Sequence, residues 1–163
     1  MIELKQFRDK WLAEGFDDYI GFYNREFFCL DNFSSFCVCV DGILYCTVEH
    51  AYQAIKFIDT APEVAELITN CYSAYDAQRI AHENIDKQRA DWDDVKVSVM
   101  ERLVRLKLNQ NPYVKRKLLE TENYTICEDS PKDAFWGIGP NKDGRNELGK
   151  IWMKLRDELR TAE

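Results

Sequence analysis

The sequence predicts a predominantly helical α+β fold, a single compact domain with a small β-sheet that contains an early hairpin. Its 163 residues are 45% hydrophobic and 31% charged, the ordinary composition of one globular domain. A turn sequence, Asp41-Gly42, separates two short β-prone runs. Helical signals dominate after residue 46, and helices that follow a small sheet indicate the α+β class. We therefore expect residues 1–163 to form one domain, with residues 1–19 as an N-terminal extension packed on it.

The hairpin is the clearest local signal. Asp41-Gly42 favours a two-residue type I′ turn, which pairs Val40 with Ile43 and, further out, brings Cys37 opposite Cys46. These two thiols would be close enough to oxidise; the alternative is a pair of small buried side chains in the sheet. Both faces of the hairpin are apolar, so we expect other elements to cover it on both sides.

The other elements are predicted from hydrophobic spacing and from residues that begin helices. Thr47 and Ser73 can accept hydrogen bonds at helix N-termini, and proline suits the first turn of a helix. Strands are expected around residues 19–23 and 124–127. Helices are expected over residues 4–12, 48–58, 62–68, 74–79 and 92–108, from Pro112 onward, and from Asn146 to about residue 159.

Composition argues against several functional classes. No apolar run reaches the roughly 20 residues of a membrane helix, and the first residues lack an apolar signal core. The 22 Lys and Arg against 29 Asp and Glu give a net charge of −7, which disfavours binding of polyanions by the whole surface. The six cysteines form no Cys-x-x-Cys pair, and His50 and His82 are the only histidines, so zinc-ligand spacing is absent. We expect a cytoplasmic protein with reduced thiols and without a metal or cofactor.

Three polar groups line up on the predicted helix after the hairpin. Glu49, Gln53 and Lys56 are spaced at i, i+4 and i+7, beside the apolar stripe of the same helix. A carboxylate, an amide and an ammonium at the edge of a core stripe are suited to the wall of a binding pocket. The alternative is a solvated face on which Glu49 balances the helix N-terminus.

Two further segments carry candidate functional residues. Trp92 is either a core tryptophan or a platform on which a planar base stacks, and Arg89 before it could bind a phosphate. The segment 128–139 follows a predicted strand and is polar, then aromatic, then glycine-rich, as ligand-binding loops often are. Asp133 is its candidate acid; the alternative is an aspartate that caps a turn.

Taken together, these segments resemble the YbiA-like, or NADAR, family of N-glycosidases. The order and spacing of the matching motifs cover residues 20–159, nearly the whole chain. The motifs are Asp31-Asn32-Phe33, Val40-Asp41-Gly42, Thr47-Val-Glu-His-Ala-Tyr-Gln-Ala-Ile-Lys56, Asp91-Trp92 with Val95-Lys96 and Val99-Met100, Ser130-Pro-Lys-Asp133, Trp136-Gly137 and Gly144-Arg-Asn146-Glu-Leu-Gly149.

The resemblance implies a compact, mainly helical α+β domain that hydrolyses N-glycosidic bonds to ribose. The substrates it implies are phosphoribosyl aminopyrimidine intermediates of riboflavin synthesis, ADP-ribosylated guanine or NAD-derived metabolites. We thus expect a phosphoribosylated or ADP-ribosylated small molecule, no membrane, and nucleic acid only as a modified substrate. The implied catalytic residues are Glu49, Asp133 and Lys56. The implied substrate contacts are Asn32, Phe33, Gln53, Arg89, Trp92, Lys96, Trp136, Gly137 and Asn146.

Cleavage of a ribosyl C–N bond builds positive charge on the sugar and negative charge on the departing nitrogen. One carboxylate near each partner answers this demand, and Glu49 and Asp133 are the expected pair, with exchangeable roles. A Schiff base on Lys56 is another route. The competing function is a non-catalytic ADP-ribose or nucleotide-binding module. The sequence departs from the family where Ala81-His82 replaces a Gly-Arg pair, so an anion contact there would need Arg79 or Arg89.

Overall fold

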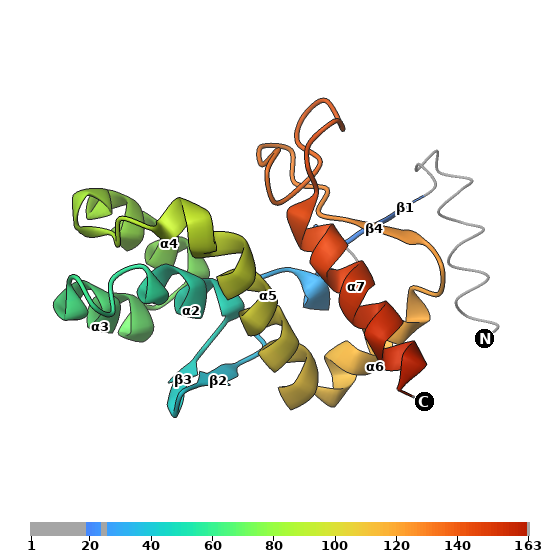
Figure 1. The fold of residues 1–163 in the computed structure, drawn as a ribbon, viewed down its shortest axis with the longest axis horizontal. Coiled ribbons are helices and arrows are strands. Elements are labelled where there is room, and N and C mark those ends of the chain that lie inside the picture. The colour runs from blue at the N-terminus through green and yellow to red at the C-terminus, as the bar shows by residue number, and fades with distance from the viewer. Residues whose placement is uncertain (1–18, 24–25, 163) are drawn as a thin grey trace. The chain divides into compact units, whose positions relative to one another are not determined.

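The computed structural model describes residues 19–23 and 26–162, which fall into two compact units. We call Asp31–Val114 the central unit, and the described residues up to Leu30 and from Lys115 the terminal unit. The described residues contain six α-helices and two two-stranded sheets, which confirms a predominantly helical α+β fold (Figure 1). The predicted helix over residues 4–12, and the predicted extension apart from Tyr19, lie outside the described residues.

The central unit contains a hairpin followed by four α-helices and a short 3₁₀ helix, and a fifth α-helix begins within it. Its strands and helices are β2 Val38–Val40, β3 Ile43–Tyr45, α2 Val48–Ile55, α3 Pro62–Asn70, α4 Ala74–Glu83, the short 3₁₀ helix Ile85–Lys87, α5 Trp92–Gln110 and the start of α6 Pro112–Glu120. The terminal unit adds β1 Tyr19–Gly21, the 3₁₀ helix Phe28–Leu30, β4 Thr125–Cys127 and α7 Glu147–Thr161. All predicted elements within the described residues are therefore present, with shifted ends.

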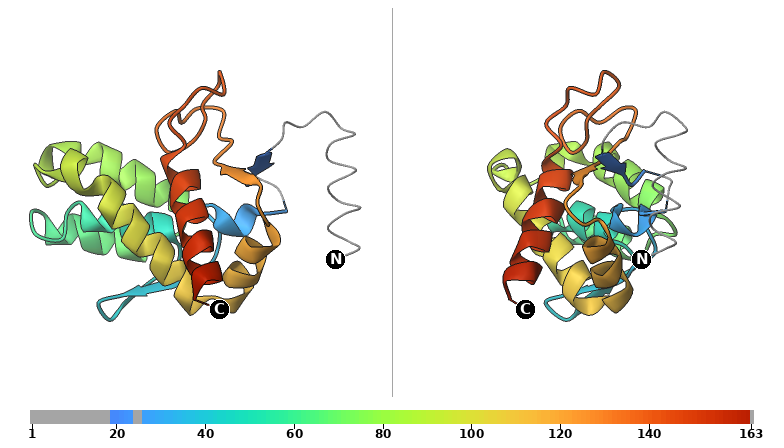
Figure 2. Two further views of the ribbon diagram at one scale, coloured as in Figure 1. Left: turned by 45° about the vertical axis from the view of Figure 1, so that its right-hand side comes forward. Right: turned by 90° about the vertical axis from the view of Figure 1, so that its right-hand side faces the viewer.

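The hairpin has the predicted turn and register. Asp41 (φ 51°) and Gly42 (φ 85°) are both left-handed, as a type I′ turn requires, and Val40 pairs with Ile43. The expected cover on both faces is wrong. Val38 is buried, whereas Leu44 is 65% exposed, because α2 and α5 pack only against one face of the hairpin. The tip of the hairpin projects away from α2, α3 and α4 (Figures 1 and 2).

The two hairpin thiols that we expected to face each other are exposed. Cys37 and Cys46 flank the last pair of the register, Val38 with Tyr45. The alternative that both are buried in the sheet is therefore wrong. Their oxidation stays a prediction.

The helix starts follow the capping signals. Thr47 Oγ1 accepts a hydrogen bond from the His50 amide at 3.2 Å, and Ser73 Oγ accepts one from the Asp76 amide at 3.1 Å. One end is wrong. The helix over 48–58 ends at Ile55, because the next amides bond three residues back, and Ile58, the last residue of the predicted helix, is 43% exposed.

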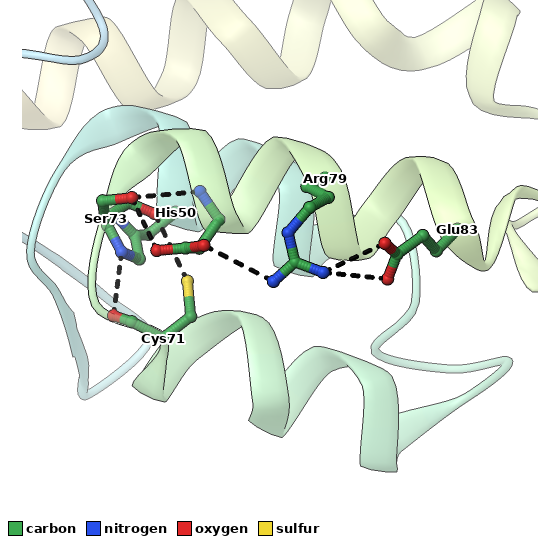
Figure 3. Close-up of polar contacts among 6 residues, drawn as sticks. His50, Cys71, Ser73, Arg79 and Glu83 are labelled. Atoms are coloured by element: carbon green, nitrogen blue, oxygen red, sulfur yellow. Dashed lines mark hydrogen bonds and ion pairs between the residues drawn. The ribbon is translucent and has the colours of Figure 1, made fainter.

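His50 links α2 to the C-terminal end of α3. Its imidazole is buried, with Nδ1 2.8 Å from the Thr47 hydroxyl and Nε2 3.3 Å from the Cys71 carbonyl oxygen. Because a carbonyl only accepts, Nε2 carries the proton and donates, and Nδ1 accepts from Thr47. The same cluster continues along α4 through Ser73 and Arg79 (Figure 3). Burial lowers the pKa of His50, against smaller upward effects of the Cys71 hydrogen bond and of Asp76.

We expect the protein to lose stability as the pH falls below about 6.5, because His50 is then protonated in the unfolded chain but stays neutral in the folded protein. The free energy of unfolding should fall by at most about 1.4 kcal/mol per pH unit until the lowered pKa is reached. Urea unfolding at pH 7.5, 6.5 and 5.5 measures this. His50→Gln should flatten the slope, and the exposed His82→Gln should leave it unchanged. An equal slope in wild type and His50→Gln would contradict the assignment.

The terminal unit is built around β4 and α7. β1 and β4 pair in parallel, and α7 contacts β4. Trp152 is fully buried and donates from Nε1 to the Leu30 carbonyl at 2.9 Å. Gly149 allows the close approach of α7, because a Cβ there would lie 2.2 Å from the Ile126 carbonyl oxygen. A long loop between β4 and α7 extends beyond the N-terminal end of α7 (Figures 1 and 2).

Candidate active site

The polar stripe of α2 is buried. Glu49 and Gln53 are 4% and 5% exposed, and Gln53 Nε2 donates to Glu49 Oε1 at 2.6 Å. The alternative of a solvated face is therefore wrong. Thr47 caps the helix, so the first turn of α2 fixes the Glu49 backbone, and the i, i+4 spacing sets Gln53 beside it. The result is a carboxylate held by an amide within a buried environment.

Lys56 completes this stripe at the end of α2. Its Nζ lies 5.3 Å from the ring centre of Tyr52 and 5.2 Å from that of Trp92. The two rings meet edge to face, with centres 4.9 Å apart. Burial lowers the pKa of Lys56; Glu49 opposes this shift, and Lys96 adds to it. The lowered pKa gives this lysine a larger neutral fraction than an exposed one has, which is what a nucleophilic amine requires.

Asn32 lies next to the N-terminus of α2. Its carbonyl accepts the Glu49 amide at 3.1 Å, and its side-chain amide donates to Met100 Sδ on α5 at 3.4 Å. The turn that carries it, residues 31–34, is held by the fully buried Lys107, whose Nζ donates to the Asp31 carbonyl at 2.8 Å and to Ser34 Oγ at 2.7 Å. Side chains of α5 therefore hold this turn in position.

Trp92 satisfies both of its interpretations in part. It is 5% exposed and packs against Tyr52, as a core tryptophan does. It also lies beneath the ammonium of Lys56 and begins α5, next to the polar stripe. Its role as a platform for a base stays a prediction.

The expected phosphate ligands already have acidic partners. Arg89 donates twice to Asp91, at 2.6 and 2.9 Å, and Lys96 donates to Asp93 at 2.7 Å. A phosphate would have to compete with these carboxylates, so binding by Arg89 and Lys96 stays a prediction.

Phe33 is half-buried against Tyr75, with ring centres 4.9 Å apart.

The site residues expected in the loop after β4 lie in the terminal unit. Asp133 caps a turn, because its Oδ1 accepts from the amides of Phe135 and Trp136, both at 2.8 Å. Trp136 is half-buried and packs edge to face against Phe135. The alternative of a turn-capping aspartate thus accounts for one Asp133 oxygen. A catalytic role for this carboxylate stays a prediction.

Asn146 and Gly137 hold the loop in shape. Asn146 is left-handed (φ 53°), and its side chain accepts from the Glu128 amide at 3.0 Å and donates to the Ile126 carbonyl at 2.9 Å. The Gly137 carbonyl accepts the Asn146 amide, and a Cβ on Gly137 would lie 2.4 Å from the Glu128 carbonyl oxygen. Both residues serve backbone geometry, and their contact with substrate stays a prediction.

The departure from the family pattern falls on α4. Ala81 is buried and His82 is exposed in the last turn of that helix. Arg79, one expected substitute, is exposed and paired with Asp76 and Glu83 (Figure 3).

Comparison with known proteins defines the family. A family model described as the NADAR domain matches residues 21–160. The chain belongs to this family. An N-glycosidase of Nostoc punctiforme is 35% identical over 144 residues, which are 86% of this chain and 92% of that protein. The NMR structure of YbiA from Escherichia coli matches with a TM-score of 0.79 at 32% identity, and the match covers 90% of this chain and 88% of that one. The resemblance inferred from the motifs is confirmed.

A longer relative matches this chain over part of its own length. A riboflavin biosynthesis protein of Vibrio vulnificus is 42% identical over 130 residues. The match takes in 80% of this chain and 35% of that protein, so the chain spans about a third of that relative's length.

Three side chains next to the candidate site were not singled out as functional from the sequence. Tyr52 follows Glu49 by three residues and precedes Lys56 by four, so the helical spacing that selected its neighbours could have found it. Met100 and Lys107 lie 68 and 76 residues from their partners in the 31–34 turn, and no local signal connects them.

In residues 19–23 and 26–162, no three His, Cys, Asp or Glu side chains are grouped to hold a metal ion. None of the helices in the same ranges has the length and apolar character needed to cross a membrane.

Proposed function

We propose that this NADAR protein is an N-glycosidase that hydrolyses the C–N bond between a ribose and a nitrogenous leaving group. Curated relatives of matching length are named N-glycosidases. The observation that carries the proposal is the buried Glu49–Gln53 pair at 2.6 Å on the same helix as Lys56, whose amine lies over Trp92. A buried carboxylate, a lysine of lowered pKa and an aromatic ring are the groups this chemistry needs.

In the proposed reaction, Glu49 is the general acid that protonates the leaving group. The departing nitrogen gains electron density as its bond to C1 breaks, and a proton from the Glu49 carboxylic acid neutralises it. The Gln53 amide fixes the orientation of that carboxyl group by donating to Oε1. Water supplies the oxygen of the product sugar and restores the proton to Glu49, so ribosyl base and water give free base and free sugar.

Lys56 supplies the nucleophile in the route that we favour. Its neutral amine forms a bond to C1 as the C1–N bond to the base breaks. The sugar ring opens to an iminium ion, which water hydrolyses to the sugar aldehyde while the amine is released. Direct attack of water on the sugar, assisted by Asp133, is the alternative.

The favoured substrate class is a phosphoribosyl aminopyrimidine, with ADP-ribosylated guanine and NAD as alternatives. A relative named as a riboflavin biosynthesis protein supports the first. Arg89 and Lys96 are candidate ligands of the sugar phosphate, and Trp92 is the candidate platform for the base.

Base release tests the function. Purified protein is incubated in parallel with a phosphoribosyl aminopyrimidine, an ADP-ribosylated guanine and NAD, and free base is followed by mass spectrometry. Release from one substrate, and its loss in Glu49→Gln, would support the proposal and name the leaving group. Binding without release from any of them would favour a nucleotide-binding module instead. Asp133→Asn in the same assay tests the second carboxylate.

We expect Lys56→Arg to lower base release at least about a hundredfold, because arginine keeps the charge and cannot form an imine. Borohydride added during turnover should attach the reduced sugar to Lys56 in the wild type and to no residue in the variant. The mass of the peptide that contains residue 56 measures this. An active Lys56→Arg variant with no trapped adduct would assign Lys56 to charge stabilisation and the attack to water.

A further inference from the structure

Two buried side-chain oxygens, on residues that are hydrogen-bonded to Glu49, lack hydrogen-bond donors. In the part of the chain that the structure describes, three buried side-chain polar atoms have no partner, and they are Asn32 Oδ1, Gln53 Oε1 and Arg156 Nε. The first two belong to the residues that contact Glu49, one through its carbonyl oxygen and one through its side-chain amide. Leaving a buried acceptor unsatisfied destabilises the fold, so two of them on residues bonded to Glu49 need an explanation.

The orientation of both amides is fixed by their nitrogens. While Glu49 is ionised, Gln53 Nε2 donates to its carboxylate, and a flipped amide would set oxygen against oxygen. Asn32 Nδ2 donates to Met100 Sδ, which is an acceptor only. Neither oxygen can therefore be satisfied by rotation of its own amide. Both residues are more than nine-tenths buried, at 7% and 5% exposure, so bulk water does not reach them freely.

The hydrogen-bond acceptors of Asn32, Gln53 and Glu49 determine which kind of ligand fits. Asn32 Oδ1, Gln53 Oε1 and, while it is ionised, the Glu49 carboxylate only accept hydrogen bonds, so they repel a phosphate and attract a group that donates hydrogen bonds. The lysines near this site lie farther along, Lys56 at the end of α2 and Lys96 on α5, and Lys96 is the candidate ligand of the phosphate. The base, rather than the sugar phosphate, is then the part of the substrate that faces the acceptors.

We propose that Asn32 and Gln53 read an amino group on the leaving heterocycle, by accepting its N–H hydrogen bonds at Oδ1 and Oε1. That this heterocycle is the leaving group rests on the proposed function, but its recognition by Asn32 and Gln53 needs no turnover. It restricts the substrate class to amino-bearing heterocycles and gives Asn32 a specificity role. A ribose hydroxyl is the other donor that a substrate could offer, and the test separates the two.

Three nucleotides distinguish these donors by binding alone. Guanosine 5′-monophosphate and inosine 5′-monophosphate differ only in the exocyclic amino group, and 2′-deoxyguanosine 5′-monophosphate lacks only the 2′-hydroxyl. Titration calorimetry on the full chain should give guanosine 5′-monophosphate a roughly ten- to hundredfold advantage over the inosine nucleotide. The deoxy nucleotide should bind as well as its ribose counterpart. Because no bond is broken, this readout remains valid if base release fails.

Asn32→Leu and Gln53→Leu assign the preference to these oxygens. Each should erase most of the advantage of the amino nucleotide, by weakening its binding while binding of the inosine nucleotide changes little. Asn32→Leu should not lower the melting temperature by more than a few degrees, because it removes an unsatisfied acceptor. Asn84→Leu, a half-buried amide at the end of α4, is the matched control and should leave the ratio unchanged.

The remaining outcomes overturn the proposal. Equal binding of the guanosine and inosine nucleotides would do so, as would a preference that depends on the 2′-hydroxyl. An equal loss of both ligands in Asn32→Leu would make Asn32 a structural residue of the 31–34 turn. No binding of any of the three nucleotides also counts against it, because the two acceptors are offered to any amino-bearing base.

Discussion

Replacing Glu49 with glutamine is expected to lower kcat for base release by about 10²–10⁴-fold, the range found when a positioned proton donor is removed. Glutamine keeps the shape of the side chain and an Oε1 acceptor for Gln53 Nε2, so the hydrogen bond at 2.6 Å can persist. It cannot deliver a proton to the departing nitrogen. The free energy of unfolding should change by about 1 kcal/mol or less. Single-turnover base release and urea unfolding of the same preparation measure both quantities.

The leaving group provides an internal check on this result. A substrate whose nitrogen leaves without protonation should lose much less rate in Glu49→Gln than one with a basic leaving group. Glu66→Gln on α3 is the matched control, because Glu66 is exposed, and it should change neither rate nor stability. If Glu49→Gln keeps its rate on every leaving group, the proton donor is another residue and the proposed mechanism is wrong.

The face of α2 could be predicted because its chemistry is local. Helical spacing alone aligns Glu49, Gln53 and Lys56, and it needs no knowledge of the tertiary fold. Their burial could not be read from the pattern, since the polar stripe lies beside the apolar one. Burial depends on contacts with α3, α4 and α5, which come from elsewhere in the chain.

The hairpin illustrates the same limit in the opposite direction. Its turn type and register follow from Asp41-Gly42, and both are confirmed. The prediction of cover on both faces assumed that apolar side chains are always buried. Leu44 shows why that assumption fails: a soluble protein exposes part of its apolar surface, and only contact with other elements decides which part.

The presence of a polar and glycine-rich loop after β4 could be predicted, but the hydrogen bonds that shape this loop could not. Its composition indicated a ligand loop, and a turn-capping Asp133 was among the interpretations. The hydrogen bonds that the Asn146 side chain makes with the backbone of residues 126 and 128 were not predicted, because these residues lie 18 to 20 positions away in the sequence. A left-handed asparagine at a helix start leaves no periodic signal.

Lys107→Met is expected to lower the free energy of unfolding by about 2–4 kcal/mol. The ammonium is fully buried, and it donates charge-assisted hydrogen bonds to the Asp31 carbonyl and to Ser34 Oγ. Each such bond contributes about 1.5–3 kcal/mol, and methionine of similar length recovers part of the loss by packing beside Phe36. Urea unfolding at pH 7.5 measures the change.

The control for this loss is Lys87→Met, which removes an exposed ammonium 3.9 Å from Glu63 and should change stability by less than about 0.5 kcal/mol. Under conditions where Lys107→Met is still folded, we expect weaker substrate binding as well, because the 31–34 turn carries Asn32 to the Glu49 end of α2. A stable variant would contradict the assigned role of the lysine. A destabilised variant with unchanged substrate affinity would show that α2 and Met100 hold Asn32 without help from the turn.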